Sequence, residues 1–376
     1  MSVSPLFHMS VAAVPPDLAA VAAAFPLDGP IASSAPYGNG HINETYLVIV
    51  ATASGERRYV FQKINHRIFK NVPALMENIA RVTAHVRAKQ PRALALVSTR
   101  AGEIVHRTAA GEWWRLYDFI EGAHTVERVT TEAQAREAAR AFGEYQALLV
   151  DLPGGRLNDT IPNFHHTRSR FETLRRAVNE DTQGRVAGVR AEIDFATARE
   201  ADTDVLLDLL ARGELTERVT HNDTKINNVM LDEVTGRCAT VIDLDTVMPG
   251  LSLYDFGDMV RTAASSTAED NPDPTQMHVV LPYFRALVEG YLESAGAVLN
   301  ATERAHLGFA GKLLAFETGL RFLTDHLQGD VYFRIHRPGH NLDRARTQFA
   351  LVKSIEDNAD AMRLIVAAAE KTTTVF

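Results

Sequence analysis

The chain has 376 residues, of which 46% are hydrophobic and 23% are charged, a balance typical of a globular protein large enough for two domains. Its formal net charge of -8 argues against a nucleic-acid partner, since proteins that bind the phosphate backbone carry a basic surface. A single cysteine, Cys238, excludes an internal disulfide and is typical of a reducing compartment.

In chain order, the first predicted element is a short amphipathic helix over residues 18–25. This stretch is apolar, but it follows Pro15-Pro16-Asp17, which is typical of a helix start, and no cationic segment precedes it as in a signal peptide. No apolar run elsewhere approaches the roughly 20 residues that span a bilayer. We therefore expect a cytoplasmic protein with no membrane partner.

The next predicted elements are strands. Residues 36–50 are expected to form a strand, a turn and a strand, because a glycine-containing turn precedes an alternating and then β-branched run. Residues 57–64 are expected to form a further strand, in which alternation places Gln62 and Lys63 on opposite faces.

Most of the remaining chain shows helical periodicity. Between residues 130 and 151, for example, apolar side chains recur every three or four residues along one side. A strand over residues 112–122 ends at a glycine. The predicted helices cover residues 71–87, 130–151, 168–178, 201–211, 278–295, 302–327 and 342–371.

A predicted hairpin with polar residues at both ends lies between two of these helices. Residues 229–231 and 239–242 are short apolar runs, and the turn between them contains Gly236. Folding this hairpin brings Asn228, at the start of the first strand, beside Asp243, at the end of the second.

Asp223 lies one loop before the hairpin, so two carboxylates and a carboxamide are expected to converge. Like charges about 4 Å apart repel by roughly 4 kcal/mol at an effective dielectric of about 20, so the group requires a cation. Oxygen ligands favour a hard ion such as Mg²⁺. The order Asp223, Asn228, Asp243 matches the protein-kinase catalytic loop and metal-binding aspartate, where the first accepts a hydroxyl proton and the others hold magnesium. A turn rich in asparagine and aspartate, without such a role, is the plainer interpretation.

These motifs resemble the aminoglycoside phosphotransferase and choline kinase superfamily, and within it the bacterial N-acetylhexosamine 1-kinases. The resemblance extends from about Tyr37 through the C-terminal helices. It implies an α+β, protein-kinase-like fold with two lobes. A small antiparallel-sheet lobe over residues 1–120 would cover the nucleotide, and a larger, mainly helical lobe over residues 121–376 would carry the catalytic loop. The segments that carry the resemblance are 38–43, 220–225, 241–250 and 255–258.

The resemblance also implies the cofactors, ATP and Mg²⁺, and the roles of individual residues. Asp223 is expected to be the catalytic base and to contact the acceptor, and Asn228 and Asp243 are expected to bind the metal. His221 and Asp255 are expected to be structural, with Asp255 buried against the catalytic-loop backbone. Because Gln62 and Lys63 are adjacent on the predicted strand 57–64, only one of them can face the phosphates. The expected nucleotide contacts are Gly38, Asn39, Gly40, Gln62, Lys63, Phe119, Ile120 and Glu121.

The implied reaction is phosphorylation of the anomeric hydroxyl of an N-acetylhexosamine such as GlcNAc or GalNAc. His41, Arg321 and Tyr332 are the further implied sugar contacts, although a surface arginine and a core tyrosine are equally consistent with the sequence. The resembled kinases have an aromatic residue near the sugar where this chain has Thr262. The alternatives are an aminoglycoside, choline-like or other small-alcohol acceptor, and an inactive kinase-like binding module. Nothing in the sequence indicates an oligomeric state.

Overall fold

The chain folds into two compact units, Met1–Glu121 and Gly122–Phe376. The structure is a computed structural model and describes residues 16–38 and 42–373. Three expected site residues, Asn39, Gly40 and His41, therefore lie outside the described residues. Within those two ranges, no helix has the length and the apolar character needed to cross a bilayer.

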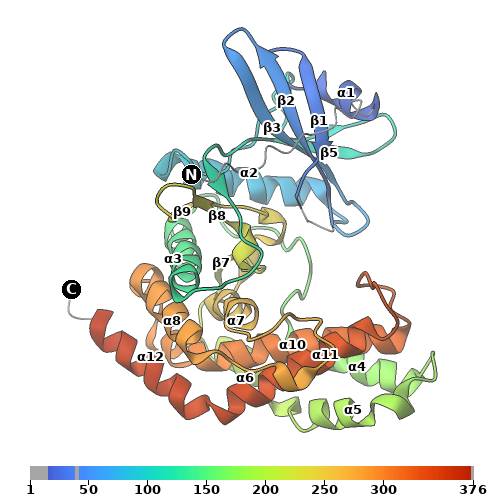
Figure 1. The fold of residues 1–376 in the computed structure, drawn as a ribbon, viewed down its shortest axis with the longest axis vertical. Helices are drawn as coiled ribbons and strands as arrows, with labels where there is room; N and C mark the ends of the chain where they lie inside the picture. Colours follow the sequence, from blue (N-terminus) through green and yellow to red (C-terminus); the bar gives the residue numbers. More distant parts are fainter. Residues whose placement is uncertain (1–15, 39–41, 374–376) are drawn as a thin grey trace, which may run out of the picture. The chain divides into compact units, whose positions relative to one another are not determined.

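The first unit is built on a five-stranded antiparallel sheet with the order β1-β2-β3-β5-β4 (Figure 1). Its register pairs Gln62 with Thr45 on one side and with Arg115 on the other. The helices predicted for this part of the chain and the strand over 57–64 are confirmed. The strand before the glycine-containing turn ends at Pro36, so it lies upstream of the predicted segment 36–50, and the strand predicted over 112–122 ends at Asp118. Their bounds are α1 (Pro16–Ala22), β1 (Ile31–Pro36), β2 (Glu44–Thr52), β3 (Gly55–Ile64), α2 (Val72–Lys89), β4 (His106–Arg107) and β5 (Trp113–Asp118).

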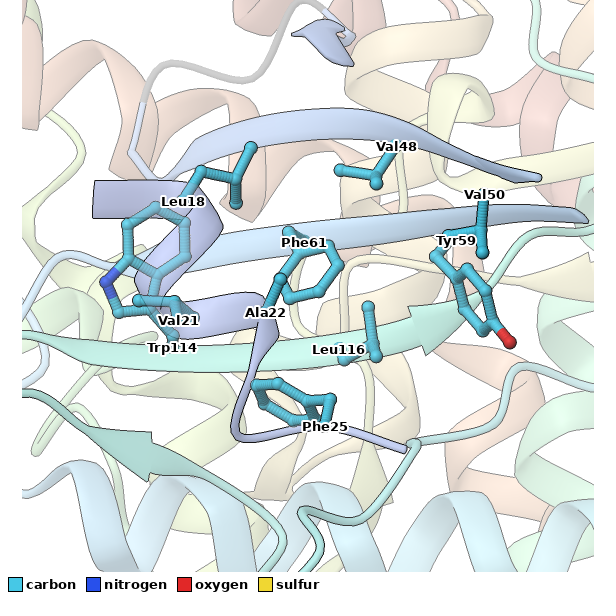
Figure 2. Close-up of a cluster of buried hydrophobic side chains, with 10 residues drawn as sticks. All are labelled: Leu18, Val21, Ala22, Phe25, Val48, Val50, Tyr59, Phe61, Trp114 and Leu116. Carbon is cyan, nitrogen blue, oxygen red and sulfur yellow. The ribbon is translucent and has the colours of Figure 1, made fainter. Parts of the chain in front are cut away.

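One face of this sheet forms a hydrophobic core with α1 (Figure 2). Leu18 of α1, Phe61 of β3 and Trp114 of β5 are all buried in it. Burying a side chain of this size stabilises the fold by about 1.5–3 kcal/mol. Because strand residues alternate, Lys63 shares the side of Phe61, whereas Gln62 belongs to the opposite face.

The second unit is mainly helical (Figure 1). Helix α3 lies along α8, and α10 lies along α7 and α11. The approach of α8 to α3 requires glycine, since a Cβ at Gly290 would lie 2.2 Å from the carbonyl oxygen of Arg136. The helices are α3 (Glu132–Leu149), α4 (Thr167–Glu180), α5 (Arg190–Thr197), α6 (Val205–Ala211), α7 (Ser252–Ala263), α8 (Leu281–Ala295), α9 (Ala301–Ala305), α10 (Leu307–Gln328), α11 (His340–Asp357) and α12 (Ala359–Thr373).

Two helices predicted as continuous are interrupted in the structure. The segment 302–327 is divided into α9 and α10 at His306, whose ring nitrogen Nδ1 lies 2.7 Å from the carbonyl oxygen of Thr302. The segment 342–371 is divided into α11 and α12 at Asn358. At the second break, the side-chain amide of Asn358 donates to the carbonyl oxygen of Ser354 at 2.8 Å. Polar side chains that bond carbonyls of the preceding turn in this way compete with the backbone hydrogen bonds of the helix.

Two small antiparallel sheets in this unit carry the polar motifs. Strands β7 (Arg218–Thr220) and β10 (Met248–Gly250) pair with each other. Strands β6 (Ala123–His124), β8 (Val229–Asp232) and β9 (Cys238–Val241) form the other sheet, in which β8 and β9 are the predicted hairpin. The hairpin prediction is therefore confirmed.

Candidate active site

The open end of the hairpin brings Asn228 next to the residues that follow β9. The N–H of Ile242 donates to the carbonyl oxygen of Asn228 at 2.9 Å, and Asp243 is the next residue. Asp243 has a left-handed backbone conformation, with φ of +58°, and it turns the chain out of the strand into a 3-10 helix over residues 244–246. Aspartate is one of the few residues other than glycine that adopt this conformation readily.

Asn228 also fixes the side chain of Asp223. Its amide nitrogen Nδ2 donates to the backbone carbonyl of Asp223 at 2.8 Å and to the carboxylate oxygen Oδ2 at 3.3 Å. These two acceptors determine which end of the amide carries the nitrogen. The oxygen Oδ1 of Asn228 is consequently the end available to a cation.

Lys225 contacts the other carboxylate oxygen of Asp223. Its ammonium nitrogen Nζ lies 3.1 Å from Oδ1, and the Asp223 carboxylate raises the pKa of Lys225. The two side chains are partly exposed, at 42% for Lys225 and 27% for Asp223. Sequence reasoning missed this contact, although residues two apart in an extended loop project to the same side.

Asp243 lies near two other carboxylates, those of Asp245 and Asp223. Burial among surrounding protein atoms, together with the carboxylates of Asp245 and Asp223, raises the pKa of Asp243 to about 6, although its side chain keeps a face open to solvent. In the described ranges, no group of three or more His, Cys, Asp or Glu side chains is placed to hold a metal ion. A metal set at this end of the hairpin would instead combine the Asp243 carboxylate with the Asn228 amide oxygen.

Asp255, in the first turn of α7, holds the backbone that leads to Asp223. Its Oδ1 accepts the N–H of Asn222 at 2.7 Å, and its Oδ2 accepts the N–H of His221 at 3.0 Å. Gln146 of α3 donates to the same Oδ2 at 2.7 Å. Asp255 is fully buried, so these three donors supply the hydrogen bonds that a buried carboxylate requires.

Asp258, one turn later on α7, holds the backbone on the other side of Asp223. Its Oδ2 accepts the N–H of Thr224 at 2.9 Å, while Arg261 binds Oδ1 at 2.8 Å. Sequence reasoning missed this aspartate. Thr262 donates its hydroxyl to the Asp258 carbonyl at 2.8 Å, which is a bond within the helix.

His221 connects the loop to the end of β9. Its Nε2 lies 2.9 Å from the carbonyl oxygen of Ile242, and its Nδ1 accepts the N–H of Asp223 at 3.3 Å. A neutral imidazole with the proton on Nε2 satisfies both contacts. The ring is buried and meets the edge of Phe142, with 5.3 Å between the ring centroids.

His165 lies against the Asn222 carbonyl, and sequence reasoning gave it no role. Its Nε2 is 3.0 Å from that oxygen, and its Nδ1 is 2.8 Å from Oε1 of Glu317 on α10. The contact joins residues 152 positions apart, so no local pattern in the sequence indicates it.

Arg321 lies one turn beyond Glu317 on α10, among aromatic rings. Its guanidinium carbon is 5.6 Å from the ring centroid of Phe164, 5.9 Å from that of Tyr332 and 5.4 Å from that of Phe333. Tyr332 is 63% exposed, which corrects the alternative reading of this residue as a core tyrosine. The structure thus brings Arg321 and Tyr332 together, and their contact with a sugar stays a prediction.

Asp325 fixes the loop that carries Tyr332. Its carboxylate accepts three backbone N–H groups at 2.8 to 2.9 Å, and the donors are Val331, Tyr332 and Phe333. Asn341 of α11 donates to the same carboxylate at 2.9 Å. The backbone of residues 331–333 is therefore bonded to the Asp325 carboxylate.

In the first unit, the structure separates Gln62 from Lys63. Lys63 forms ion pairs with Glu112 at 2.5 Å and with Glu44 at 3.6 Å, and its contact with Glu112 raises the pKa of Lys63. Gln62 donates to Thr45 at 3.1 Å and accepts a bond from the buried Arg115 at 2.9 Å. The two candidates thus face different sides of the sheet, and the lysine already has carboxylate partners.

The segment after β5 is held by arginines. The guanidinium of Arg58 lies over the ring of Phe119 at 4.1 Å and pairs with the carboxylate of Glu121. Its backbone carbonyl accepts the N–H of Phe119 at 3.4 Å. Arg92 donates to the Glu121 carbonyl at 3.0 Å. Ile120 lies between these two fixed residues.

Known proteins share this architecture. A family model described as the phosphotransferase enzyme family (APH) matches residues 34–296, which is more than half of the chain. A microcompartment-associated aminopropanol kinase is 17% identical with a TM-score of 0.57, and the match covers 92% of this chain and 99% of that one. The choline kinase of Cryptosporidium parvum is 14% identical with a TM-score of 0.53, covering 94% and 98%. An amicoumacin kinase in complex with AMP-PNP, Ca²⁺ and Ami is 14% identical with a TM-score of 0.55, covering 90% and 92%. These similarities confirm the expected kinase-like fold.

Proposed function

Because the chain belongs to the phosphotransferase enzyme family, we propose that it transfers the terminal phosphoryl group of ATP to a hydroxyl group of a small molecule. The observation that carries this proposal is the end of the hairpin, where Asn228 binds Asp223 and lies beside the segment that begins with Asp243. Phosphoryl transfer requires little covalent chemistry from the protein, so positioning and charge neutralisation supply most of the acceleration.

Asp223 is the proposed base. Its carboxylate is oriented by Asn228 on one oxygen and by Lys225 on the other, and its side chain keeps contact with solvent. In this role it binds the acceptor hydroxyl and takes up its proton as the phosphoryl group is transferred. A positioned base contributes about 10²–10⁴-fold to the rate.

The residues beside it fit a magnesium ion. Asp243 and the amide oxygen of Asn228 are hard oxygen donors. Burial and the carboxylates of Asp245 and Asp223 raise the pKa of Asp243, and a cation would offset the effect of the carboxylates. Asp243 and Asn228 would hold Mg²⁺, which would supply neutralisation of charge on the phosphate oxygens. His221 and Asp255 act on this set indirectly, through the loop backbone.

Nucleotide binding is assigned to the unit Met1–Glu121. Gly38, Asn39 and Gly40 are the proposed phosphate contacts. Of these the structure describes Gly38, which has φ of +77° and carries no side chain to block an approaching phosphate. Gln62 is the proposed donor on β3. Lys63 is the weaker candidate because Glu112 already neutralises it.

The adenine contact is assigned to the segment Phe119–Glu121. The N–H of Phe119 and the carbonyl of Glu121 are bonded to Arg58 and Arg92. The peptide groups of Ile120, between them, are therefore the proposed partners of the adenine edge.

The proposed acceptor is the anomeric hydroxyl of an N-acetylhexosamine, with Arg321, Tyr332 and His41 as contacts. Exposed Tyr332 offers a ring face and a hydroxyl, and Arg321 offers hydrogen-bond donors to sugar oxygens. A cationic amino alcohol is the second candidate, because an aminopropanol kinase and a choline kinase share the fold. The positive charge of Arg321 favours the neutral sugar.

The test is an acceptor panel read by phosphorus NMR of the products. GlcNAc and GalNAc are expected to yield sugar 1-phosphates in a reaction that requires ATP and Mg²⁺. If aminopropanol or choline reacts and neither GlcNAc nor GalNAc does, the acceptor is a cationic amino alcohol, the second candidate. Absence of Mg²⁺-dependent ATP binding would indicate an inactive binding module.

A further inference from the structure

His165 and Glu317 form a buried pair next to the catalytic loop, outside the proposed chemistry. His165 is 9% exposed and Glu317 is 1% exposed. The hydroxyl of Thr167 donates to Oε2 of Glu317 at 2.7 Å, while the histidine occupies Oε1. Both carboxylate oxygens thus have partners, as the burial of a charged group requires.

Both ring nitrogens of His165 face hydrogen-bond acceptors. Nδ1 faces the carboxylate of Glu317, and Nε2 faces the backbone carbonyl of Asn222. A neutral imidazole has only one N–H, so the two contacts together require the doubly protonated ring. Burial opposes the charged form, but Glu317 and the Asn222 carbonyl outweigh it and raise the pKa of His165.

The carbonyl that His165 binds belongs to the peptide bond between Asn222 and Asp223. Asn222 has a left-handed conformation, with φ of +63°, which asparagine adopts more readily than most residues other than glycine. Asp255 holds its N–H, and its side-chain amide donates to the carbonyl of Thr246 at 2.9 Å. His165 supplies the remaining contact, on the carbonyl side.

We propose that the His165–Glu317 pair positions the Asp223 carboxylate, because the charged imidazole fixes the plane of the Asn222–Asp223 peptide. The pair also links the loop to α10, where Arg321 lies one turn beyond Glu317. The position of the proposed base and that of the proposed acceptor contact are thus set by one ion pair. This inference rests on the proposed function of Asp223. His165 is a positioning residue, since it acts through the backbone of its neighbour.

The charged and titratable groups around the pair determine its dependence on pH. Asp258 of α7 favours the charged His165, and Arg321 lowers the pKa of Glu317. The ring of Tyr254 lies 5.2 Å from that of His165, and burial raises the pKa of this tyrosine, so it stays neutral. The folded-state pKa of His165 lies above its unfolded value. The protonated His165 therefore stabilises the fold fully below its unfolded-state pKa, about 6.5, and this stabilisation is lost as the pH rises through its folded-state pKa.

The decisive variant is Glu317→Gln, measured in the full chain with ATP and GlcNAc, with Glu172→Gln on the exposed side of α4 as the matched control. Removing the carboxylate lowers the pKa of His165, so the alkaline limb of the kcat profile is expected to move to lower pH. At pH 8 we expect kcat to fall about 10–100-fold with the KM for ATP nearly unchanged, because a small misplacement of a reacting group costs up to about 10²-fold. Glu317→Asp, which keeps the charge, is expected to recover part of the loss. An unchanged profile in Glu317→Gln would overturn the proposal.

A measurement without turnover separates this inference from the proposed function. In wild-type protein with ¹⁵N-labelled histidine, the ring of His165 is expected to show two N–H signals at pH 7, with assignment by His165→Gln. A neutral ring with one N–H would overturn the inference even if GlcNAc is phosphorylated. Two N–H signals would support it even if Glu317→Gln fails to fold. If no acceptor in the panel reacts, the proposed function fails and the ring protonation is still measured.

Discussion

The side-chain amide of Asn228 donates to both the backbone carbonyl and the carboxylate of Asp223, at 2.8 and 3.3 Å. One asparagine therefore orients the proposed base while its free oxygen remains available to the proposed metal. The two functions meet at this residue, but they rely on different neighbours. Substitutions of those neighbours are expected to separate the chemical step from metal and nucleotide binding.

Asp223→Asn is expected to lower kcat by about 10²–10⁴-fold, because the amide cannot take up the hydroxyl proton. The affinity for ATP with Mg²⁺ is expected to stay within about twofold, since Asn228 and Asp243 are unchanged. Steady-state kinetics and calorimetric titration of the nucleotide test both statements. Asp360→Asn, at a 91% exposed side chain, is the matched control. Turnover close to that of the wild type would refute the role of Asp223.

Asp243→Asn is expected to weaken Mg²⁺-dependent ATP binding and also to stabilise the metal-free protein. The raised pKa of Asp243 means that burial and its acidic neighbours disfavour the ionised carboxylate in the fold. Asparagine tolerates the same left-handed backbone, so the main change is the lost charge. Because the side chain is partly open to solvent, we expect a gain of about 1 kcal/mol or less. Thermal unfolding with EDTA and with Mg²⁺ plus ATP measures the two effects, and a variant with full Mg²⁺-dependent affinity would exclude Asp243 as a ligand.

Asp255→Asn is expected to destabilise the fold by about 2–4 kcal/mol. The buried carboxylate accepts three hydrogen bonds, and an amide presents one acceptor oxygen and brings an N–H₂ toward backbone donors. Urea unfolding followed by circular dichroism gives the free energy of unfolding. Asp360→Asn, at a 91% exposed side chain, is the control and should change the free energy of unfolding far less. Equal stability of the two variants would contradict the structural role of Asp255.

Gly257→Ala is expected to destabilise the protein by about 3 kcal/mol through overpacking. A Cβ at this position of α7 would lie 2.4 Å from the carbonyl oxygen of Ala310 on α10, and backbone gives way poorly. The matched change Gly308→Ala, where the nearest atom is Met362 Cβ at 3.8 Å, is expected to stabilise α10 by about 0.5–1 kcal/mol. Thermal unfolding of the pair gives opposite shifts. If Gly257→Ala unfolds at the same temperature as the wild type, α7 and α10 are less closely packed than the 2.4 Å distance implies.

The sequence alone predicted the parts of the site that depend on residues close together in the chain. The hairpin follows from two apolar runs around a turn, and it places Asn228 near Asp243 with no long-range information. Strand alternation likewise separated Gln62 from Lys63. It did not say which of them faces the core, because that depends on where α1 packs. The prediction of continuous helices over 302–327 and 342–371 was wrong. The spacing of apolar residues carries no information about side chains that hydrogen-bond to the helix backbone, as those at the two breaks do.

The resemblance placed Asp255 against the backbone of the proposed catalytic loop, but the long-range side-chain pairs that support this loop were beyond sequence reasoning. Gln146 reaches Asp255 across 109 positions, and His165 reaches Glu317 across 152. Each partner alone is an ordinary helix or loop residue, and no local period connects them. Such pairs become visible only when packing brings α3, α4, α7 and α10 together. Polar contacts between residues far apart in the chain are therefore the part of the site that a single sequence does not predict.

The hydrogen bonds from the backbone of residues 331–333 to Asp325 have a consequence for how acceptor preference can diversify. Asp325 accepts the backbone N–H groups of three successive residues there, and these hydrogen bonds do not involve the side chains of the three residues. Replacements at Tyr332 can therefore remodel the chemistry presented to a substrate while the main-chain path is inherited unchanged. The proposed acceptor contact and the phosphoryl-transfer machinery are then free to evolve at different speeds.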